Sequence, residues 1–348
     1  MYRGEIVQNF SKLSLLLDGL LFCSSYNGKV YKIYLISFSM GSLSKLGFMA
    51  SIFSLFLQPS NGSYNESVLK DGNKVSVSNV SNRGGLEKKF NDPDSLHSTL
   101  VWKKIDTGLY SGEITPLLKS DFGDSKINVL KIDPELYSFD LISAKEKKIA
   151  NKTADKWAEL DGLLAAINAG MYQSDYKTNV GFMKDYEFFN NPRMNKDNTV
   201  VAFNRKDDSV PEFQIIDLQT QDWDVLKDKY NSFTQGIRMI DSNQKNRWSQ
   251  QDKKWSIASI GMNKKGDALF LFSRSPYSVH DFNNILLNSG LDIYNAMYLE
   301  GGPEASFYLN HQGSEIKKFG SYETGFNEND SNSSYWKIPN IIGISKKD

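Results

Sequence analysis

The alternation of apolar and polar residues from Ser98 onward predicts a domain built mainly from β-strands. Short runs of Val, Ile, Leu, Phe and Tyr, bounded by Gly, Asn and Asp, are typical of strands. Such runs lie at 100–102, 127–132, 136–142, 165–168, 179–183, 200–203, 213–216, 233–240, 257–261, 267–274, 294–300 and 338–344. The pattern predicts an α+β fold in which mixed, largely antiparallel sheets pack with a few helices.

Three segments have the periodicity or the capping residues of helices. They are 154–164, 223–230 and the segment from Ser278 to Gly290. In the first, Trp157 and Leu160 fall on one apolar face. In the third, Ser278 is the expected N-cap, with Asp281 near the position of a capping box.

One carboxylate stands at the end of a predicted strand, in Leu299-Glu300-Gly301-Gly302-Pro303. Paired glycines allow positive φ and the close approach of a ligand or another strand. The strand–helix–strand series before it predicts that Glu300 lies at the carboxyl end of its strand, where crevices form in α/β layers. The alternative is a tight hairpin whose acid is solvated.

Two more polar residues interrupt apolar runs. Asn168 ends a short strand, where its amide can meet a polar ligand or form an Asx-turn. Arg238 follows Gly236 between apolar neighbours, and it is either paired within the fold or directed at an anion. Arginine is the side chain that binds phosphate or carboxylate through two parallel hydrogen bonds.

The first part of the chain differs from the rest in composition. Residues 46–57 form an apolar run of twelve residues after Lys45. This matches a signal peptide better than a membrane span, which needs about twenty residues. A signal-anchor over residues 30–57 is the alternative, and the only expected contact with a membrane.

The segment after the apolar run predicts a flexible linker that joins the N-terminal signal segment to an exported domain. Residues 58–97 are rich in Ser, Asn and Gly and lack the apolar surface to offset chain entropy. The expected organisation is an N-terminal extension over 1–57, a flexible linker over 58–97 and a single globular domain over 98–348. The expected location is periplasmic, cell-envelope or secreted.

Charge and cysteine content exclude several classes of function. Lys plus Arg and Asp plus Glu number 41 each, so no electrostatic argument favours nucleic acid as a partner. Cys23 is the only cysteine, which rules out an intrachain disulfide. The three histidines lie far apart in sequence and argue against a zinc centre. No cofactor is expected, although a divalent cation bound by carboxylates stays open.

Taken in order, these blocks resemble the phosphodiester glycosidase family. The Asn-Gly-Gly-Phe-Phe-like block of that family is matched by Asn168-Ala169-Gly170-Met171-Tyr172, and its downstream glycine by Gly181. Its basic mid-chain strand is matched by Gly236-Ile237-Arg238, and its Leu-Asp-Gly-Gly block by Leu299-Glu300-Gly301-Gly302. The similarity covers about residues 100–344.

The chain departs from the family pattern at three places. Glu300 stands where the family has Asp, which moves the carboxylate outward by one methylene. The strand 257–261 lacks the arginine of the family, and residues 303–306 replace a series of small residues. These changes bear on activity more than on fold.

The resemblance implies hydrolysis of a sugar-1-phosphodiester at the glycosidic carbon, with a carbohydrate or sugar-phosphate as partner. Phosphate is a good leaving group, so the site needs an anion clamp and a carboxylate near the developing oxocarbenium charge. The implied catalytic residues are Glu300, as base or electrostatic stabiliser, with Arg238 and Asn168 for phosphate or sugar contacts. The implied substrate-binding residues are Gly170, Tyr172, Gly181, Arg274, Asp281, Gly301 and Gly302.

Two other functions fit the same sequence. A glycan-binding envelope protein would keep the cleft without turnover, and the substitutions around Glu300 favour it. A structural envelope protein would have no glycan role, and a glycan array without binding would support it.

The start of the chain is a testable feature. Met40 stands just before the apolar run, and we hypothesise that translation begins there, so that residues 1–39 are not made. N-terminal sequencing of the secreted protein should then find no residue from before Met40. A sequence that begins upstream of Met40 would refute the hypothesis.

Overall fold

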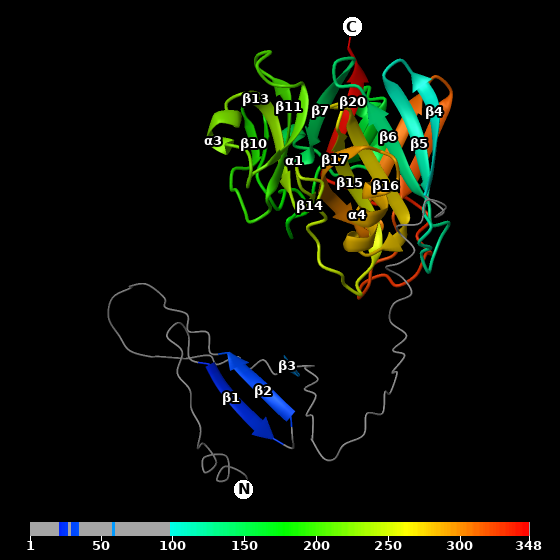
Figure 1. Ribbon diagram of the computed structural model, residues 1–348. Coiled ribbons are helices and arrows are strands. Elements are labelled where there is room, and N and C mark those ends of the chain that lie inside the picture. The colour runs from blue at the N-terminus through cyan, green and yellow to red at the C-terminus, as the bar shows by residue number, and fades with distance from the viewer. Residues whose placement is uncertain (1–20, 27–28, 35–57, 60–97, 348) are drawn as a thin grey trace. The chain divides into compact units, whose positions relative to one another are not determined.

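The computed structural model describes residues 98–347 together with three short N-terminal strands (Figure 1). Two units are distinguished, Met1–Asn82 and Arg83–Asp348. In the first, β1 (Leu21–Tyr26), β2 (Lys29–Tyr34) and β3 (Gln58–Pro59) form an antiparallel sheet in that order. The predicted signal segment 46–57 and the linker from residue 60 onward lie outside the described residues.

The described residues of the second unit form three antiparallel sheets. The seven-stranded sheet has the order β14 (Arg238–Ile240), β17 (Ile293–Gly301), β15 (Trp255–Asn263), β16 (Ala268–Tyr277), β6 (Ile127–Ile132), β5 (Leu109–Thr115), β4 (Thr99–Asp106). The β11 sheet has the order β10 (Phe188–Asn191), β9 (Met183–Asp185), β13 (Tyr230–Gly236), β11 (Thr199–Arg205), β12 (Phe213–Asp217). The β8 sheet has the order β19 (Ser314–Phe319), β18 (Ser306–His311), β8 (Ala165–Asn168), β20 (Asn340–Lys346), β7 (Tyr137–Ser143).

The three sheets share one apolar core. Phe139 of β7 lies at their junction. Its ring centroid is 4.9 Å from that of Phe213 and 5.9 Å from that of Phe203, both in the β11 sheet. It is also 6.4 Å from that of Phe270, in the seven-stranded sheet. In Figure 1, β7 and β20 accordingly lie between the β11 sheet and the strands β4 to β6.

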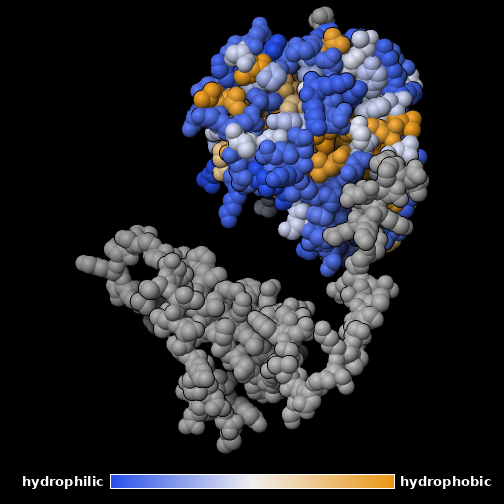
Figure 2. Space-filling view, in the orientation of Figure 1, coloured by the Kyte–Doolittle hydropathy of each residue, from blue (hydrophilic) through white to orange (hydrophobic). Residues whose placement is uncertain are grey.

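The outer faces of the sheets are covered by short helices. They are α1 (Ala144–Lys147), α2 (Ala154–Asp161), α3 (Trp223–Leu226) and α4 (Val279–Leu287). Phe282 and Leu286 of α4 pack on the seven-stranded sheet, and Trp157 of α2 packs on the β8 sheet. The surface seen in Figure 2 is mostly polar, with apolar residues in separate groups. No helix in the described part of the chain is long and apolar enough to cross a membrane.

The predicted fold class is confirmed in part: the sheets of the described residues are antiparallel and their helices few. The signal and linker expected before the domain stay predictions. The strand predicted at 127–132 forms β6 with those ends, and the strand predicted at 294–300 lies within β17. The prediction that Ser278 is the N-cap of α4 is confirmed. Its Oγ accepts a hydrogen bond from the Asp281 N–H at 3.0 Å.

Other predictions are corrected. The helix predicted over 154–164 ends at Asp161, because Gly162 adopts a left-handed conformation with φ of 68°. Leu160 is 54% exposed and does not share the buried face with Trp157. The helix predicted over 223–230 is only α3, and Tyr230 already begins β13.

The reason given for a crevice at Glu300 is also wrong. β17 pairs antiparallel with both β14 and β15, so the rule for parallel α/β layers does not apply. A β-bulge lies between Ser259 and Ala258 where they face the end of β17. Bulges redirect side chains next to functional sites, and this one precedes Glu300.

Phe139 provides a test of the three-sheet core. Phe139→Ala should lower the free energy of unfolding by about 3–5 kcal/mol, because it removes a buried ring from a site that cannot collapse. Denaturant unfolding measures this change. The matched control is Phe326→Ala, since Phe326 is 64% exposed and should cost far less. Equal losses in the two variants would show that Phe139 is not central to the core.

Candidate functional site

Asn168 connects β8 to the turn that follows β17. Its Nδ2 donates to the carbonyl oxygen of Glu304 at 3.0 Å, and its Oδ1 accepts from the N–H of Ser306 at 2.7 Å. The Asn168 side chain is buried, and these two bonds satisfy its amide within the fold. Asn168 therefore holds the turn in place, and its amide is used within the fold.

The two glycines of the motif permit close packing at the end of β17. A side chain at Gly301 would collide with the Tyr298 hydroxyl and come within 2.6 Å of Trp255 Cδ1. Gly302 has φ of 62°, and a side chain there would collide with the Glu323 carboxyl. The glycines thus allow Trp255, Tyr298 and Glu323 to lie against the motif.

Three glutamates gather around this turn. Glu300 is partly buried, and its Oε1 accepts from the Gly301 N–H at 3.1 Å. Burial raises the pKa of Glu300 from its ordinary 4.5 to about 8; the Gly301 N–H opposes this rise, while the charges of Glu304 and Glu323 add to it. Burial raises the pKa of Glu304 and of Glu323 as well. We call Glu300, Glu304 and Glu323 the glutamate cluster.

Two tyrosines are within electrostatic reach of the cluster. Burial, followed by the charges of Glu304 and Glu300, raises the pKa of Tyr172. Burial, followed by the charge of Glu300, raises the pKa of Tyr298. The structure therefore brings the predicted residues Asn168, Tyr172 and Glu300 into one region.

An aromatic group stands beside the cluster, made of Trp248, Trp255 and Tyr298. The ring centroids of Trp248 and Tyr298 are 6.1 Å apart, and each lies 6.4 Å from that of Trp255. The Trp248 indole N–H donates to the Arg238 carbonyl oxygen at 3.0 Å, which orients the ring.

Arg238 does not join the glutamate cluster. Its guanidinium donates to Asp217 Oδ1 and to Gln219 Oε1, both at 2.8 Å, and only 10% of the side chain is exposed. Arg238 and Trp248 line a cavity of about 370 Å³. Among the described residues, neither Glu300 nor Asn168 contributes to that lining.

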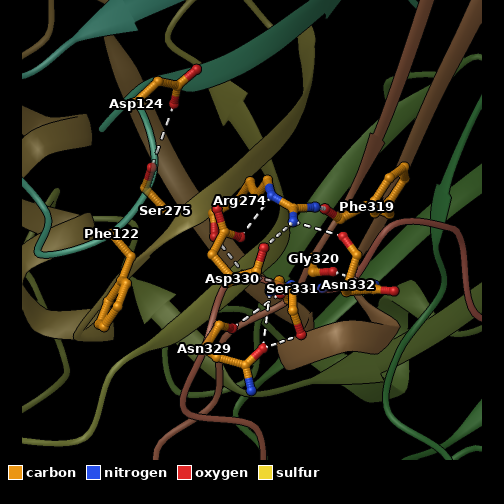
Figure 3. A network of polar contacts seen from close by, with 12 residues as sticks. Phe122, Asp124, Arg274, Ser275, Phe319, Gly320, Asn329, Asp330, Ser331 and Asn332 are labelled. Carbon is orange, nitrogen blue, oxygen red and sulfur yellow. Dashed lines mark hydrogen bonds and ion pairs between the residues drawn. The ribbon is translucent and has the colours of Figure 1, made fainter.

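Arg274 is occupied by backbone and carboxylate oxygens, as Figure 3 shows. Its Nε pairs with Asp330 at 2.8 Å, Nη1 donates to the Phe319 carbonyl at 3.0 Å, and Nη2 donates to the carbonyls of Asp330 and Asn332 at 3.1 and 2.8 Å. These contacts hold the segment after β19 against β16.

The other predicted residues also have contacts within the fold. Asp281 accepts from the Ser278 hydroxyl at 2.8 Å and from Gln250 Nε2 at 3.3 Å. Gly170 has φ of 144° and lies where a Cβ atom would be 2.6 Å from Asn179 Oδ1. A Cβ atom at Gly181 would be 2.8 Å from the Gln235 carbonyl oxygen.

Sequence reasoning missed most of the residues that surround Glu300. Glu304 follows the motif closely, and its carboxylate could have been suspected from that position. Glu323 and Trp255 gave no such signal, since they come from distant segments that meet through a β-bridge between them. Within the described ranges, no group of three or more His, Cys, Asp or Glu side chains is placed to hold a metal ion.

The chain is similar to known proteins in sequence pattern and in fold. The family model described as phosphodiester glycosidase matches residues 161–345. No sequence among the curated proteins matches the chain.

Two solved structures resemble the fold. The catalytic domain of zebrafish N-acetylglucosamine-1-phosphodiester alpha-N-acetylglucosaminidase, auto-inhibited by its pro-peptide, is 13% identical with a TM-score of 0.50; the match covers 73% of this chain and 89% of that one. A hypothetical protein from Synechocystis is 13% identical with a TM-score of 0.46, over 70% of this chain and 63% of that one.

The raised pKa of Glu300 predicts a pH-dependent stability. Between pH 4.5 and about 8 the unfolded chain releases the Glu300 proton while the folded chain retains it, so the native state loses stability as pH rises. Glu300→Gln removes this loss. The unfolding free energy of the variant relative to wild type should rise by a few kcal/mol between pH 4.5 and pH 8. Above pH 8 this difference should stay constant.

Denaturant unfolding at several pH values measures this difference. Glu187→Gln is the control, because Glu187 is exposed and its replacement should give a curve parallel to wild type. A difference between Glu300→Gln and wild type that stays constant with pH would contradict the buried, protonated state of Glu300.

Proposed function

The chain belongs to the phosphodiester glycosidase family, and from this premise we propose that it hydrolyses the bond between a sugar and a phosphodiester group at the glutamate cluster. The observation that carries the proposal is the environment of Glu300. Its carboxyl group has a pKa of about 8 and lies with two further glutamates beside a turn that Asn168 holds in place. Pairs of carboxyl groups in unlike environments are how glycosidases divide acid and base roles.

The shifted pKa assigns Glu300 a role as proton donor. At neutral pH most molecules carry Glu300 protonated, so it can give its proton to the phosphate oxygen that leaves the anomeric carbon. The sequence analysis expected Glu300 to act as a base. That role requires ionised Glu300, which is the minor form at neutral pH. One of Glu304 and Glu323 would then accept the single proton that the attacking water releases as its oxygen bonds to the anomeric carbon, and the other, ionised, would stabilise the oxocarbenium-like charge.

Other residues of the region would position the substrate. Burial raises the pKa of Glu323, and the charge of Lys253 partly opposes this rise. Lys253 would supply positive charge toward the phosphate. Tyr172 would flank the sugar. Asn168 would act indirectly, since its amide is bound to Glu304 and Ser306.

A glycan-binding protein without turnover is the second candidate. The terminal guanidinium nitrogens of Arg238 and the amide of Asn168 are bound to protein atoms, so neither is free for phosphate in this conformation. Export to the periplasm, envelope or medium is part of both proposals and rests on the apolar segment 46–57.

Turnover of sugar-1-phosphodiesters tests the proposed function. Wild type should release free sugar from at least one member of a panel, and Glu300→Gln should lower kcat/KM by about 10²–10⁴-fold, the usual loss for a general acid. Activity should fall as pH rises through about 8, because the Glu300 proton is then lost.

The outcomes separate the two candidates. Glu187→Gln, at an exposed site, should keep wild-type turnover. Binding of the panel without release of sugar would support the glycan-binding candidate. A Glu300→Gln variant as active as wild type would remove the role assigned to Glu300.

A further inference from the structure

We propose that Gly320 is a positioning residue for the proposed reaction and that Glu323, which it places, is the base. Gly320 lets the segment 320–324 lie directly on the turn after β17, where Glu323 joins the glutamate cluster. We call residues 320–324 the covering segment. The inference rests on the proposed function, because it assigns the proton of the attacking water to one of the two glutamates that this function leaves open.

Gly320 is required for close packing and not for its backbone conformation, since its φ lies outside the positive region. A Cβ atom at this position would collide with the Gly302 carbonyl oxygen and come within 2.9 Å of Ser256 Cβ. The carbonyl oxygen belongs to the backbone, so it cannot turn aside as the end of a flexible side chain can. A larger residue at position 320 would therefore lift the covering segment from the turn.

Backbone hydrogen bonds attach the covering segment both to the turn and to β15. The Gly320 N–H donates to the Ala305 carbonyl oxygen at 2.8 Å. The Ser256 N–H, in β15, donates to the Tyr322 carbonyl oxygen at 2.9 Å. Glu323 follows Tyr322 directly. The position of the Glu323 backbone therefore depends on how closely Gly320 approaches the turn.

Arg274 and Asn332 hold Gly320 in this contact, as Figure 3 shows. The Asn332 side chain donates from Nδ2 to the Gly320 carbonyl oxygen at 2.6 Å. Arg274 Nη2 in turn donates to the Asn332 carbonyl oxygen at 2.8 Å. Arg274, which the family resemblance implied as a substrate-binding residue, therefore contributes indirectly, through the backbone of Gly320.

Glu323 is better placed for the base role than Glu304. Its carboxyl group lies against Gly302 and comes from a segment distant in sequence, whereas Glu304 belongs to the same run of chain as Glu300. The acid and the base of a glycosidase flank the scissile bond, and two separate segments can do so. Burial raises the pKa of both glutamates; the charge of Lys253 opposes this rise at Glu323, while the charge of Glu323 adds to it at Glu304. Glu323 therefore ionises first, as a base requires.

In this arrangement Glu323 takes one proton from the attacking water as the water oxygen bonds to the anomeric carbon. The electron pair of the bond that breaks leaves with the phosphate oxygen, which receives the proton of Glu300. Glu300 ends ionised and Glu323 ends protonated, and proton exchange with solvent restores both. Ionised Glu304 stabilises the oxocarbenium-like charge.

Turnover of sugar-1-phosphodiesters by the full-length protein tests the positioning. Gly320→Ala should lower kcat by about tenfold or more with little change in KM, because a displaced base slows chemistry and not binding. Glu323→Gln should lower kcat by about 10²-fold or more, and Gly320→Ala should cost little further in that background. Glu323→Asp withdraws the carboxylate by one methylene; it should lower kcat likewise and keeps the test valid if Gly320→Ala misfolds.

The pH profile separates the base from a residue that is merely structural. In wild type, kcat/KM should rise with pH as Glu323 ionises and fall as Glu300 does. Glu323→Gln should lose the rising limb, whereas Glu304→Gln should keep it. The matched control is Gly343→Ala, because a side chain there would collide with the Leu163 side chain in another part of the fold, within β20. It should keep the wild-type kcat and pH profile.

Two results would overturn the assignments. A wild-type kcat for Gly320→Ala, or an undiminished loss from it in the Glu323→Gln background, would remove the positioning role. A rising limb that persists in Glu323→Gln would remove the base role.

The pH dependence of unfolding distinguishes these results from failure of the proposed function. Besides burial, the charge of Glu323 adds to the raised pKa of Glu300. Gly320→Ala and Glu323→Gln should therefore both lower the pH at which folded Glu300 loses its proton. If wild type releases no sugar from any phosphodiester, the proposed function and the base role fail together, and this shift still decides whether Gly320 places Glu323. An unchanged Glu300 transition in Gly320→Ala would overturn the placement.

Discussion

The candidate site depends on two hydrogen bonds made by one buried amide. Asn168 at the end of β8 binds the carbonyl of Glu304 and the N–H of Ser306, and so attaches the β8 sheet to the turn after β17. Buried backbone groups without partners are costly, which makes this arrangement specific. Because the turn carries Glu304 and follows Glu300, the same two bonds hold the backbone next to both glutamates.

Burial of Glu300 lowers the stability of the folded state and keeps the carboxyl group protonated, as a proton donor requires. A carboxyl group whose pKa is raised to about 8 lowers the stability of the folded state at neutral pH. The surrounding three-sheet core, with Phe139 in contact with aromatic rings of both neighbouring sheets, supplies stability to offset that loss. Strain and unfavourable burial of this kind are common at functional sites and rare elsewhere.

The polar residues singled out from the sequence fall into two neighbouring regions. Asn168, Tyr172 and Glu300 lie around the glutamate cluster, whereas Arg238 lies in the cavity on the other side of Trp248. Sequence order suggested that all would share one pocket. The aromatic group of Trp248, Trp255 and Tyr298 joins the regions, since Trp248 lines the cavity and Trp255 lies against Gly301.

The sequence by itself determined many of the strands, the largely antiparallel α+β class and the resemblance to the family, because period-two apolar runs and glycine motifs are local signals. It missed β5, β10 and β19, and of the strand predicted at 179–183 only Met183 belongs to β9. The run 127–132 became β6, and Glu300 does end its strand region as expected. Only the tertiary structure decided which side chains meet. Glu323 reaches Gly302 from a distant segment, and Asp217 captures Arg238 from another sheet. Such contacts depend on sheet order and on a bulge in β17, and neither leaves a local pattern in the chain.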